Sequence, residues 1–522
     1  MKRFKRIIGI GLAAASLAVC CSCGGGDTGT SGGAVGDTGY NGVDNFKIAE
    51  EPTELTLFAI TDTRLDDTAV WKKIEEITNI RIKTVSSSAN SDADTAMNTM
   101  LMSGDIPDLI FSTNMKKFAN EYGPDGAFAA IDELAGEDTP NLNKQLERAV
   151  VSNYITHYDG HKYYMCNVNP DTVASGWIIR QDWLDKLGLD APTTPDEFYE
   201  VMKAFKTQDP NGNGQADEVP YLSRFGAVDD LAYLFNASWS WCVDENGKVY
   251  YGPAQENYKT AYENIAKWYS EGLIDQEIYT RGTKSRDYLF GNNTGGITHD
   301  WFGSTMQFND MLEETVPGFK LVAIAPPNEG HIEYTKREVP VDQGCAIGAT
   351  SEKKELAIKL IDFLFSETGS RLMNFGIEGE TYDLVDGKPV FKDFVVHGDK
   401  TAIQVLQELG ACSMVYEQDF EYERQWLNKE ALDGANLYID NGYVVDETFP
   451  PLSYTEEEFE RFNTIMTNVE TFRNERCQQW VFGTADVAST FDDYVAELNR
   501  LGLEEATTIQ QAAYDRYVSN SQ

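Results

Sequence analysis

Strands and helices alternate at the start of the folded body, and this order constrains the fold more than any other feature. The apolar run Leu55–Ile60 has the length of a buried strand and ends at a polar loop. A helix over Ala69–Ile77, a strand over Ile80–Val85, a helix through Met97–Met102 and a strand over Leu109–Phe111 follow. Such alternation predicts an α/β fold, in which a parallel sheet carries helices on its faces.

The loops that follow two of these strands are candidate ligand contacts. Open parallel sheets bind ligands beyond the carboxyl ends of their strands. The first strand ends at Thr61 and Asp62, and the third ends near Thr113. We therefore predict that these three residues contact a ligand.

The first 23 residues have the organisation of a bacterial export signal. Basic residues precede the apolar run Ile7–Val19, which is too short to span a bilayer. Cys20, Cys21 and Cys23 follow, and a glycine tract comes next. A cysteine between a small residue and glycines resembles the lipobox of bacterial lipoproteins, in which that cysteine is acylated.

The small Ser22 favours Cys23 as the lipidated residue. Residues 1–22 are then a lipoprotein signal peptide, and residues 23–52 a lipidated flexible tether, since residues 24–46 contain few large apolar groups. We expect the protein at the outer face of the cytoplasmic membrane, held by its N-terminal lipid. Lipidation at Cys20 or Cys21, or an ordinary cleaved secretory signal, remains an alternative.

Length and composition narrow the class of the remaining chain. A body of about 470 residues exceeds a single core and predicts two or more lobes. The net charge of −41 argues against a nucleic-acid partner, because phosphate backbones require clustered Lys and Arg. The five body cysteines are far apart and form no CxxC, so we interpret them as core residues rather than a disulfide framework or zinc site.

Six segments carry a family resemblance in their order along the chain. They are 102–108 (MSGDIPD), 177–189 (WIIRQDWLDKLGL), 209–214 (DPNGNG), 268–275 (WYSEGLID), 346–370 and 376–382 (GIEGETY). Together they resemble the extracellular solute-binding proteins of bacterial ABC sugar importers, family 1, in the large oligosaccharide-type branch that includes alginate-binding proteins.

The resemblance implies a two-lobed, periplasmic-binding-protein-like α/β fold with a hinge and a central ligand cleft. Residues 53–170, with part of 340–400, would form the N-terminal lobe, and residues 171–339 and 400–522 the C-terminal lobe. It also implies that the chain captures a carbohydrate, an oligosaccharide in this branch, outside the cell and delivers it to the permease subunits of an ABC transporter. We expect a monomer without catalytic residues.

The segment that begins at Asp209 matches the first half of a calcium-binding EF-hand loop. Oxygen-bearing side chains occupy positions one, three and five, and Gly214 occupies position six. Position twelve is Pro220 instead of Glu, so the later carboxylates must come from earlier in the loop, as they do in the family's version. The predicted ligands of a structural Ca²⁺ are Asp209, Asn211, Asn213, Gln215, Asp217 and Glu218. The alternative is a solvated Asx/Gly turn.

Aromatic residues near acidic side chains are candidate sugar contacts, because sugars present apolar C–H faces between hydroxyls. Trp301 lies where a predicted strand opens into a loop, next to Asp300. Trp301 and Tyr221 also resemble sugar-contacting positions of relatives. The remaining candidates are Trp239, Trp241, Glu378 and Tyr382. Core packing is the alternative for each aromatic residue, and we assign Trp268 to the core.

Two other functions compete with import. A surface-anchored glycoside hydrolase or lyase would share the export signal and the sugar contacts. A sugar-sensing receptor would bind the same ligand and transmit a signal. Carboxylate pairs cannot be nominated as a glycosidase dyad in so acidic a chain, and HExxH and GxxxxGK[ST] motifs do not occur.

Overall fold

The computed structural model describes residues 46–60, 64–86, 92–170, 172–335, 337, 339–398, 400–444 and 449–520. The predicted lipidation site Cys23 and the predicted ligand contacts Thr61 and Asp62 lie outside these ranges. Within them, no helix is both long enough and apolar enough to cross a bilayer.

The first lobe is built on a five-stranded sheet in the order β2-β1-β3-β11-β4. Its strands are β1 (Thr53–Ala59), β2 (Ile80–Thr84), β3 (Leu109–Ser112), β4 (Met165–Val168) and β11 (Pro340–Ile347). The predicted parallel arrangement is confirmed, since β1 pairs in parallel with β2 and β3. The late strand β11 joins the sheet antiparallel to β3 and β4.

Helices of the first lobe cover this sheet with one apolar face each. On α1 (Ala69–Thr78) the buried residues include Val70, Ile74 and Ile77, which recur at helical spacing, and the helix ends at the left-handed Asn79. The other helices are α2 (Ala93–Ser103), α3 (Met115–Tyr122), α4 (Ile131–Leu134), α5 (Pro140–Leu146), α6 (Ala149–Ile155), α13 (Lys354–Leu364), α14 (Glu367–Phe375), α15 (Asp393–Val396) and α16 (Ala402–Glu408). The hairpin β12 (Tyr382–Val385) and β13 (Lys388–Phe391) completes this lobe.

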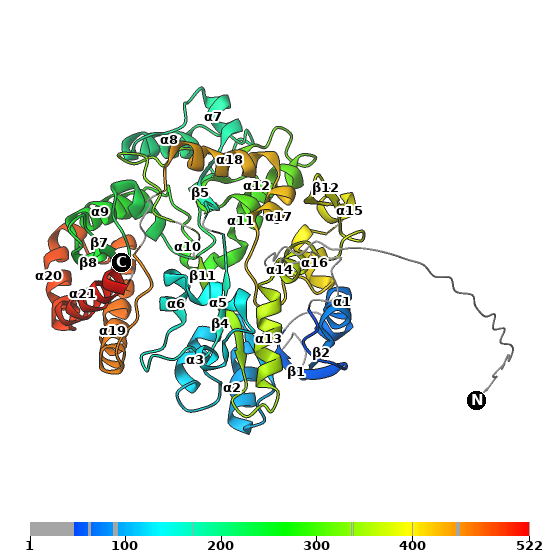
Figure 1. The fold of residues 1–522 in the computed structure, drawn as a ribbon. Coiled ribbons are helices and arrows are strands. Elements are labelled where there is room, and N and C mark those ends of the chain that lie inside the picture. Colours follow the sequence, from blue (N-terminus) through cyan, green and yellow to red (C-terminus); the bar gives the residue numbers. More distant parts are fainter. Residues whose placement is uncertain are drawn as a thin grey trace, which may run out of the picture.

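The second lobe contains a four-stranded sheet in the order β10-β5-β9-β6. Its strands are β5 (Ser175–Arg180), β6 (Val219–Tyr221), β9 (Gly295–Trp301) and β10 (Leu321–Ala323), and a hairpin of β7 (Trp241–Val243) and β8 (Val249–Tyr251) lies outside the sheet. Its main helices are α7 (Gln181–Leu187), α8 (Pro195–Thr207), α9 (Glu256–Ser270), α10 (Ile278–Arg281), α11 (Ser285–Gly291), α12 (Phe302–Leu312), α18 (Lys429–Asn441), α19 (Glu456–Val481), α20 (Val487–Arg500) and α21 (Leu503–Asn520). Figure 1 shows α19, α20 and α21 at one side of the molecule, beside β7 and β8.

Capping residues define several helix starts. Thr194 accepts a hydrogen bond from the backbone N–H of Glu197 at the start of α8. Thr455 and Glu458 form a complete capping box at the start of α19. Both helices therefore begin where the cap signals in the sequence place them.

Packing moves one expected lobe boundary. Side chains from Ala402 to Tyr422 are buried in the same core as β1, β3 and β11, although the sequence assigns everything after residue 400 to the second lobe. The apolar face of α16 and the loop after it cover the first sheet, so the chain returns to the second lobe only after α17 (Phe420–Trp426). Helices α19 to α21 pack into the core of the second lobe, as expected.

Three chain segments cross between the lobes, and hydrogen bonds join them. The Asn169 N–H donates to the Val339 carbonyl at 2.6 Å, and the Gln418 N–H donates to the Val168 carbonyl at 2.8 Å. The hydroxyls of Ser175 and Thr335 lie 3.1 Å apart at the second-lobe end of the crossing. A few extended segments of this kind can absorb the dihedral changes of a hinge without disturbing either core.

Candidate ligand-binding cleft

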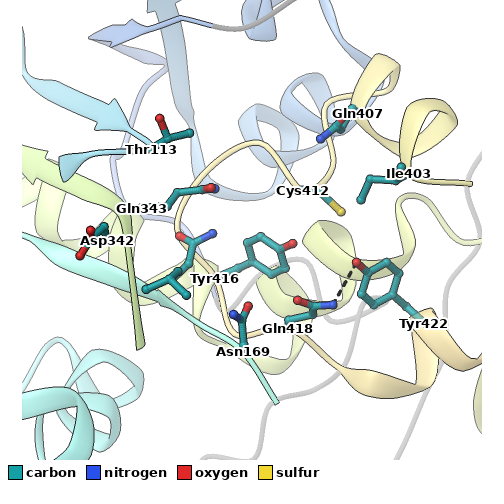
Figure 2. Close-up of a pocket in the computed structure, with 12 residues that line it drawn as sticks. Thr113, Asn169, Asp342, Gln343, Ile403, Gln407, Cys412, Tyr416, Gln418 and Tyr422 are labelled. Atoms are coloured by element: carbon teal, nitrogen blue, oxygen red, sulfur yellow. Dashed lines mark hydrogen bonds between the residues drawn. The ribbon is translucent and has the colours of Figure 1, made fainter. Parts of the chain in front are cut away.

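A cavity of about 490 Å³ opens beside the crossing segments, within the usual size range of ligand sites. Its walls come from the end of β3, from β4, β11 and α16, and from the segment that leads into α17 (Figure 2). The lining residues are Thr113, Asn167, Asn169, Val341, Asp342, Gln343, Ile403, Gln407, Cys412, Tyr416, Gln418 and Tyr422. Thr113, predicted from its position after a strand, is among them.

A buried polar network stiffens one wall of this cavity. The Gln418 side-chain amide donates to the Tyr422 hydroxyl at 3.1 Å and to Glu423 at 3.0 Å (Figure 2). Arg337 donates to Glu423 at 2.5 Å and to the Gln418 oxygen at 3.0 Å. Because Arg337 lies on a crossing segment, this network ties the cavity wall to the hinge.

Trp301 stands at the end of this network on the second lobe. The Arg337 guanidinium lies 5.6 Å from the centre of the Trp301 ring, within the range of a cation–π contact. The side chain is 37% exposed, so it is no core residue. The structure thereby brings Trp301 and Thr113 toward the same region through Arg337 and Gln418.

Phe225 is an aromatic residue that the sequence reasoning missed. Strands β6 and β9 are parallel, with Tyr221 opposite Ile297, so the loop after β6 leaves the same sheet edge as Trp301. Phe225 lies in that loop and is 56% exposed. The signal available in the sequence was its position four residues after the candidate Tyr221.

Asp300 is held differently from what the sequence suggested. Its carboxylate is buried and lies 2.8 Å from Nε of Arg224 and 3.3 Å from Nη1 of Arg286. It also accepts a hydrogen bond from the Trp301 N–H at 2.7 Å. Its Oδ1 is therefore engaged by protein groups, whereas its Oδ2 has no hydrogen-bond partner. The position of the carboxylate suits it to orient Trp301 and the two arginines.

The other predicted contacts are scattered. Tyr221 and Tyr382 are fully buried, in the second and first cores respectively. Trp239 is 40% exposed and donates its indole N–H to the Tyr233 hydroxyl at 2.5 Å. Trp241 packs against the second core, and Glu378 lies near the β12–β13 hairpin through its bridge to Tyr382. None of these five lines the cavity described above.

A buried ionic cluster lies directly beneath Trp301. Nε2 of His299 is 3.1 Å from Glu333, and its Nδ1 is 3.8 Å from Asp230. Burial alone would lower the pKa of His299, but the carboxylates of Glu333 and Asp230 outweigh it and raise this pKa to about 9. Burial raises the pKa of Asp230 to about 6. Glu333 precedes a crossing segment, so the cluster braces the base of the hinge.

The predicted calcium loop folds into a tight turn after α8. The Asp209 carboxylate accepts hydrogen bonds from the N–H groups of Asn213 and Gly214, each at 3.0 Å. The side-chain amides of Asn211 and Asn213 donate to Asp217 at 3.0 Å. Several oxygen-bearing side chains of the loop thus lie close together, next to the second-lobe strand β6.

The environment of the Glu218 side chain tests whether this loop suits a bound cation. Its side chain is fully buried, and neither carboxylate oxygen has a hydrogen-bond partner. Lys206 donates only to the backbone carbonyl of Glu218, at 2.8 Å. Burial raises the pKa of this carboxyl group. An unpaired buried carboxylate is costly, and an adjacent divalent cation would offset that cost.

The donor set of the loop is mixed. Among the described residues, no group of three or more His, Cys, Asp and Glu side chains is arranged to hold a metal ion. The predicted set instead combines three carboxylates with two asparagine amides and the Gln215 backbone carbonyl, all oxygen donors of the kind that Ca²⁺ prefers. The chemistry of these donors suits calcium and not a soft metal such as zinc, while the three carboxylates do not converge on one point in the described structure.

Comparison with known proteins identifies the class. The family of bacterial extracellular solute-binding proteins matches residues 61–370, more than half of the chain, and the chain belongs to this family. The described fold agrees with it, since solved relatives superpose over both lobes. The five described cysteines are free; four of them are buried, as expected for core residues, and Cys242 is half-buried.

Three relatives place the chain within the family. It is similar to the fructooligosaccharide ABC transporter substrate-binding protein FusA of Streptococcus pneumoniae, at 25% identity over 98% of both proteins. A solved structure of a FusA EF-hand mutant superposes with a TM-score of 0.72 at 22% identity. This match covers 90% of this chain and 100% of the FusA chain. The alginate-binding protein AlgQ2, solved without calcium ion, is 35% identical with a TM-score of 0.77, covering 90% of this chain and 99% of its own. Lipoprotein LipO of Bacillus subtilis is 28% identical over 62% of this chain and 65% of its own.

Proposed function

We propose that this protein captures an oligosaccharide in the cleft beside the crossing segments and delivers it to the permease of an ABC importer. The carrying observation is the placement of the cavity. Its lining residue Gln418 is hydrogen-bonded to the crossing residue Arg337, whose guanidinium lies 5.6 Å from the exposed second-lobe ring of Trp301. A ligand that contacts both sides is bound more tightly in the closed state, and it therefore shifts the protein toward closure.

The polar residues of the cavity suit a hydroxylated ligand. Amide and hydroxyl groups both donate and accept hydrogen bonds, as sugar hydroxyls do. The exposed rings of Trp301 and Phe225 offer flat apolar faces for the C–H patches of a sugar. This combination supports an oligosaccharide over an ion or an amino acid, which would need one small charged pocket.

Incubation with oligosaccharides separates a carrier from a surface glycoside hydrolase or lyase. We expect saturable binding and recovery of the sugar at its original length by chromatography. Shortened or unsaturated products that accumulate with enzyme-like turnover would contradict the proposal. Import is separated from sensing by deleting the gene and measuring uptake of the labelled ligand, which should fall if the chain serves a permease.

We further propose that the loop from Asp209 to Glu218 holds one structural Ca²⁺. The support is the gathered oxygen donors and the unpaired, buried Glu218 carboxylate, together with the similarity to FusA, of which an EF-hand mutant has been solved. When bound, the ion supplies charge compensation for Glu218; no chemical step is assigned to it. If chelator leaves the melting temperature of the wild type unchanged, the loop is only a turn.

The last part of the proposal is an N-terminal lipid anchor. Cys23 is proposed as the acylated N-terminus, which would hold the protein as a monomer at the outer face of the cytoplasmic membrane; the name of the relative LipO supports a lipoprotein. Mass spectrometry of the native N-terminus tests it. A mature chain that begins at Cys20 or Cys21 would change the residue and keep the anchor, whereas an unmodified N-terminus would remove both.

A further inference from the structure

The residues that line the cavity carry a net negative charge. Among the described residues that line it, Asp342 is the one carboxylate, and Lys, Arg and His do not occur. Asp342 accepts a hydrogen bond from the Tyr154 hydroxyl at 2.6 Å. Lys116 lies over the Tyr154 ring, 3.4 Å from its centre, and is not among the residues that line the cavity.

The two arginines next to the cavity wall are already paired with carboxylates. Arg337 is 9% exposed and donates to Glu423, which is 8% exposed. Arg148 lies 2.8 Å from Glu417, the residue between the lining residues Tyr416 and Gln418. Each pair is neutral as a unit. The Arg337–Glu423 pair is buried, so breaking it to serve a ligand would leave a buried charge uncompensated, whereas the Arg148–Glu417 pair is partly exposed.

One buried group in the wall requires a hydrogen-bond donor. Asn167 is 7% exposed and lines the cavity, and its Oδ1 has no hydrogen-bond partner. Its Nδ2 donates to the Met414 carbonyl at 3.4 Å, which leaves the oxygen without a partner. A donor that reached this oxygen, such as a sugar hydroxyl, would satisfy it, whereas an ionised carboxylate accepts only.

From this charge inventory we infer that the cavity selects an uncharged oligosaccharide and rejects uronates. The inference rests on the proposed function and names its substrate class. A uronate carboxylate at this wall would face Asp342, with no cationic side chain among the residues that line the cavity. A neutral sugar carries no such cost. The chain therefore differs in specificity from its alginate-binding relative, although that relative is 35% identical.

Calorimetric titration of the full mature chain with length-matched pairs tests the inference. The probes are galacto-oligosaccharides against oligogalacturonates and manno-oligosaccharides against oligomannuronates, with fructo-oligosaccharides as a further neutral probe. We expect the tightest ligand to be neutral and any uronate counterpart to bind at least about 30-fold more weakly, which is about 2 kcal/mol. Affinity for the neutral ligand should change less than about twofold between 50 and 500 mM NaCl, since no ion pair forms.

The outcomes of this titration distinguish a failure of the inferred specificity from a failure of the proposed function. If a uronate binds most tightly, the inference is overturned and the proposed function stands; loss of that binding in Lys116→Gln would then assign its counter-ion. If no carbohydrate binds, the proposed function falls and the inference falls with it.

A pair of variants locates the source of the selection. Asp342→Asn removes the carboxylate charge and keeps an acceptor, so it should tighten uronate binding about tenfold and change neutral binding less than about fivefold. Asp393→Asn on α15 removes the same charge from a side chain that is 92% exposed and should change neither. Unchanged discrimination in Asp342→Asn would contradict the role of Asp342.

Discussion

Replacing Trp301 by alanine separates a binding platform from a core residue. The ring is 37% exposed and the Arg337 guanidinium lies 5.6 Å from its centre, so its removal loses less packing than removal of a fully buried ring. We expect the free energy of unfolding to fall by about 1–2 kcal/mol. Ligand binding should weaken by about 1–3 kcal/mol, which is roughly 5- to 150-fold in Kd, the scale of a lost aromatic platform.

Trp177 supplies the matched control. It lies on the neighbouring strand β5, opposite His299, and is fully buried. Trp177→Ala should lower the free energy of unfolding by about 3–5 kcal/mol, because it leaves a cavity in the second core. Both variants are melted without ligand and titrated in the same buffer. The reasoning is refuted if Trp301→Ala melts like Trp177→Ala while the surviving protein binds with unchanged affinity.

Three further predictions concern stability and motion. In chelator, Glu218→Gln should have a higher melting temperature than the wild type, because it removes an unpaired buried charge. In calcium, its melting temperature should be lower than that of the wild type. The same order in both buffers would argue against a bound ion. Because the pKa of His299 is raised to about 9, the folded state keeps a proton that the unfolded state releases near pH 6.5. The free energy of unfolding should therefore fall, by up to about 3 kcal/mol, as pH rises from 6.5 to 9. The variant His299→Gln should flatten this pH dependence. Closure predicts a smaller radius of gyration by X-ray scattering at saturating ligand, with a weaker contraction in Arg337→Gln, since Arg337 links the hinge to the cavity wall.

Local patterns in the sequence predicted a large part of the fold. The alternation over residues 55–111 predicts the parallel part of the first sheet, and the Thr194 and Thr455 caps locate two helix starts. Hydrophobic period and cap chemistry are short-range properties, so one sequence suffices to recognise them. The return of β11 into the first sheet and of residues 402–422 into the first core depends on contacts far apart in the chain, which no local pattern encodes.

The site was predicted less completely for the same reason. Trp301 and Thr113 follow strands, and their position alone indicated exposure at a sheet edge. Asn167, Gln343 and Gln407 line the cavity because β4, β11 and α16 meet there, and nothing in their local sequence distinguishes them from other amides. Tyr221 shows the opposite case: it resembles a sugar-contacting position of relatives, yet packing buries it completely.

The central claim is that the chain binds an oligosaccharide reversibly between two lobes. The most direct test is a calorimetric titration of the mature protein, in calcium, with the neutral oligosaccharide that most raises its melting temperature. The account predicts saturable binding of one sugar per chain, and a negative heat-capacity change from the apolar surface that Trp301 and Phe225 bury. The absence of saturation with every neutral and acidic oligosaccharide tried would contradict it.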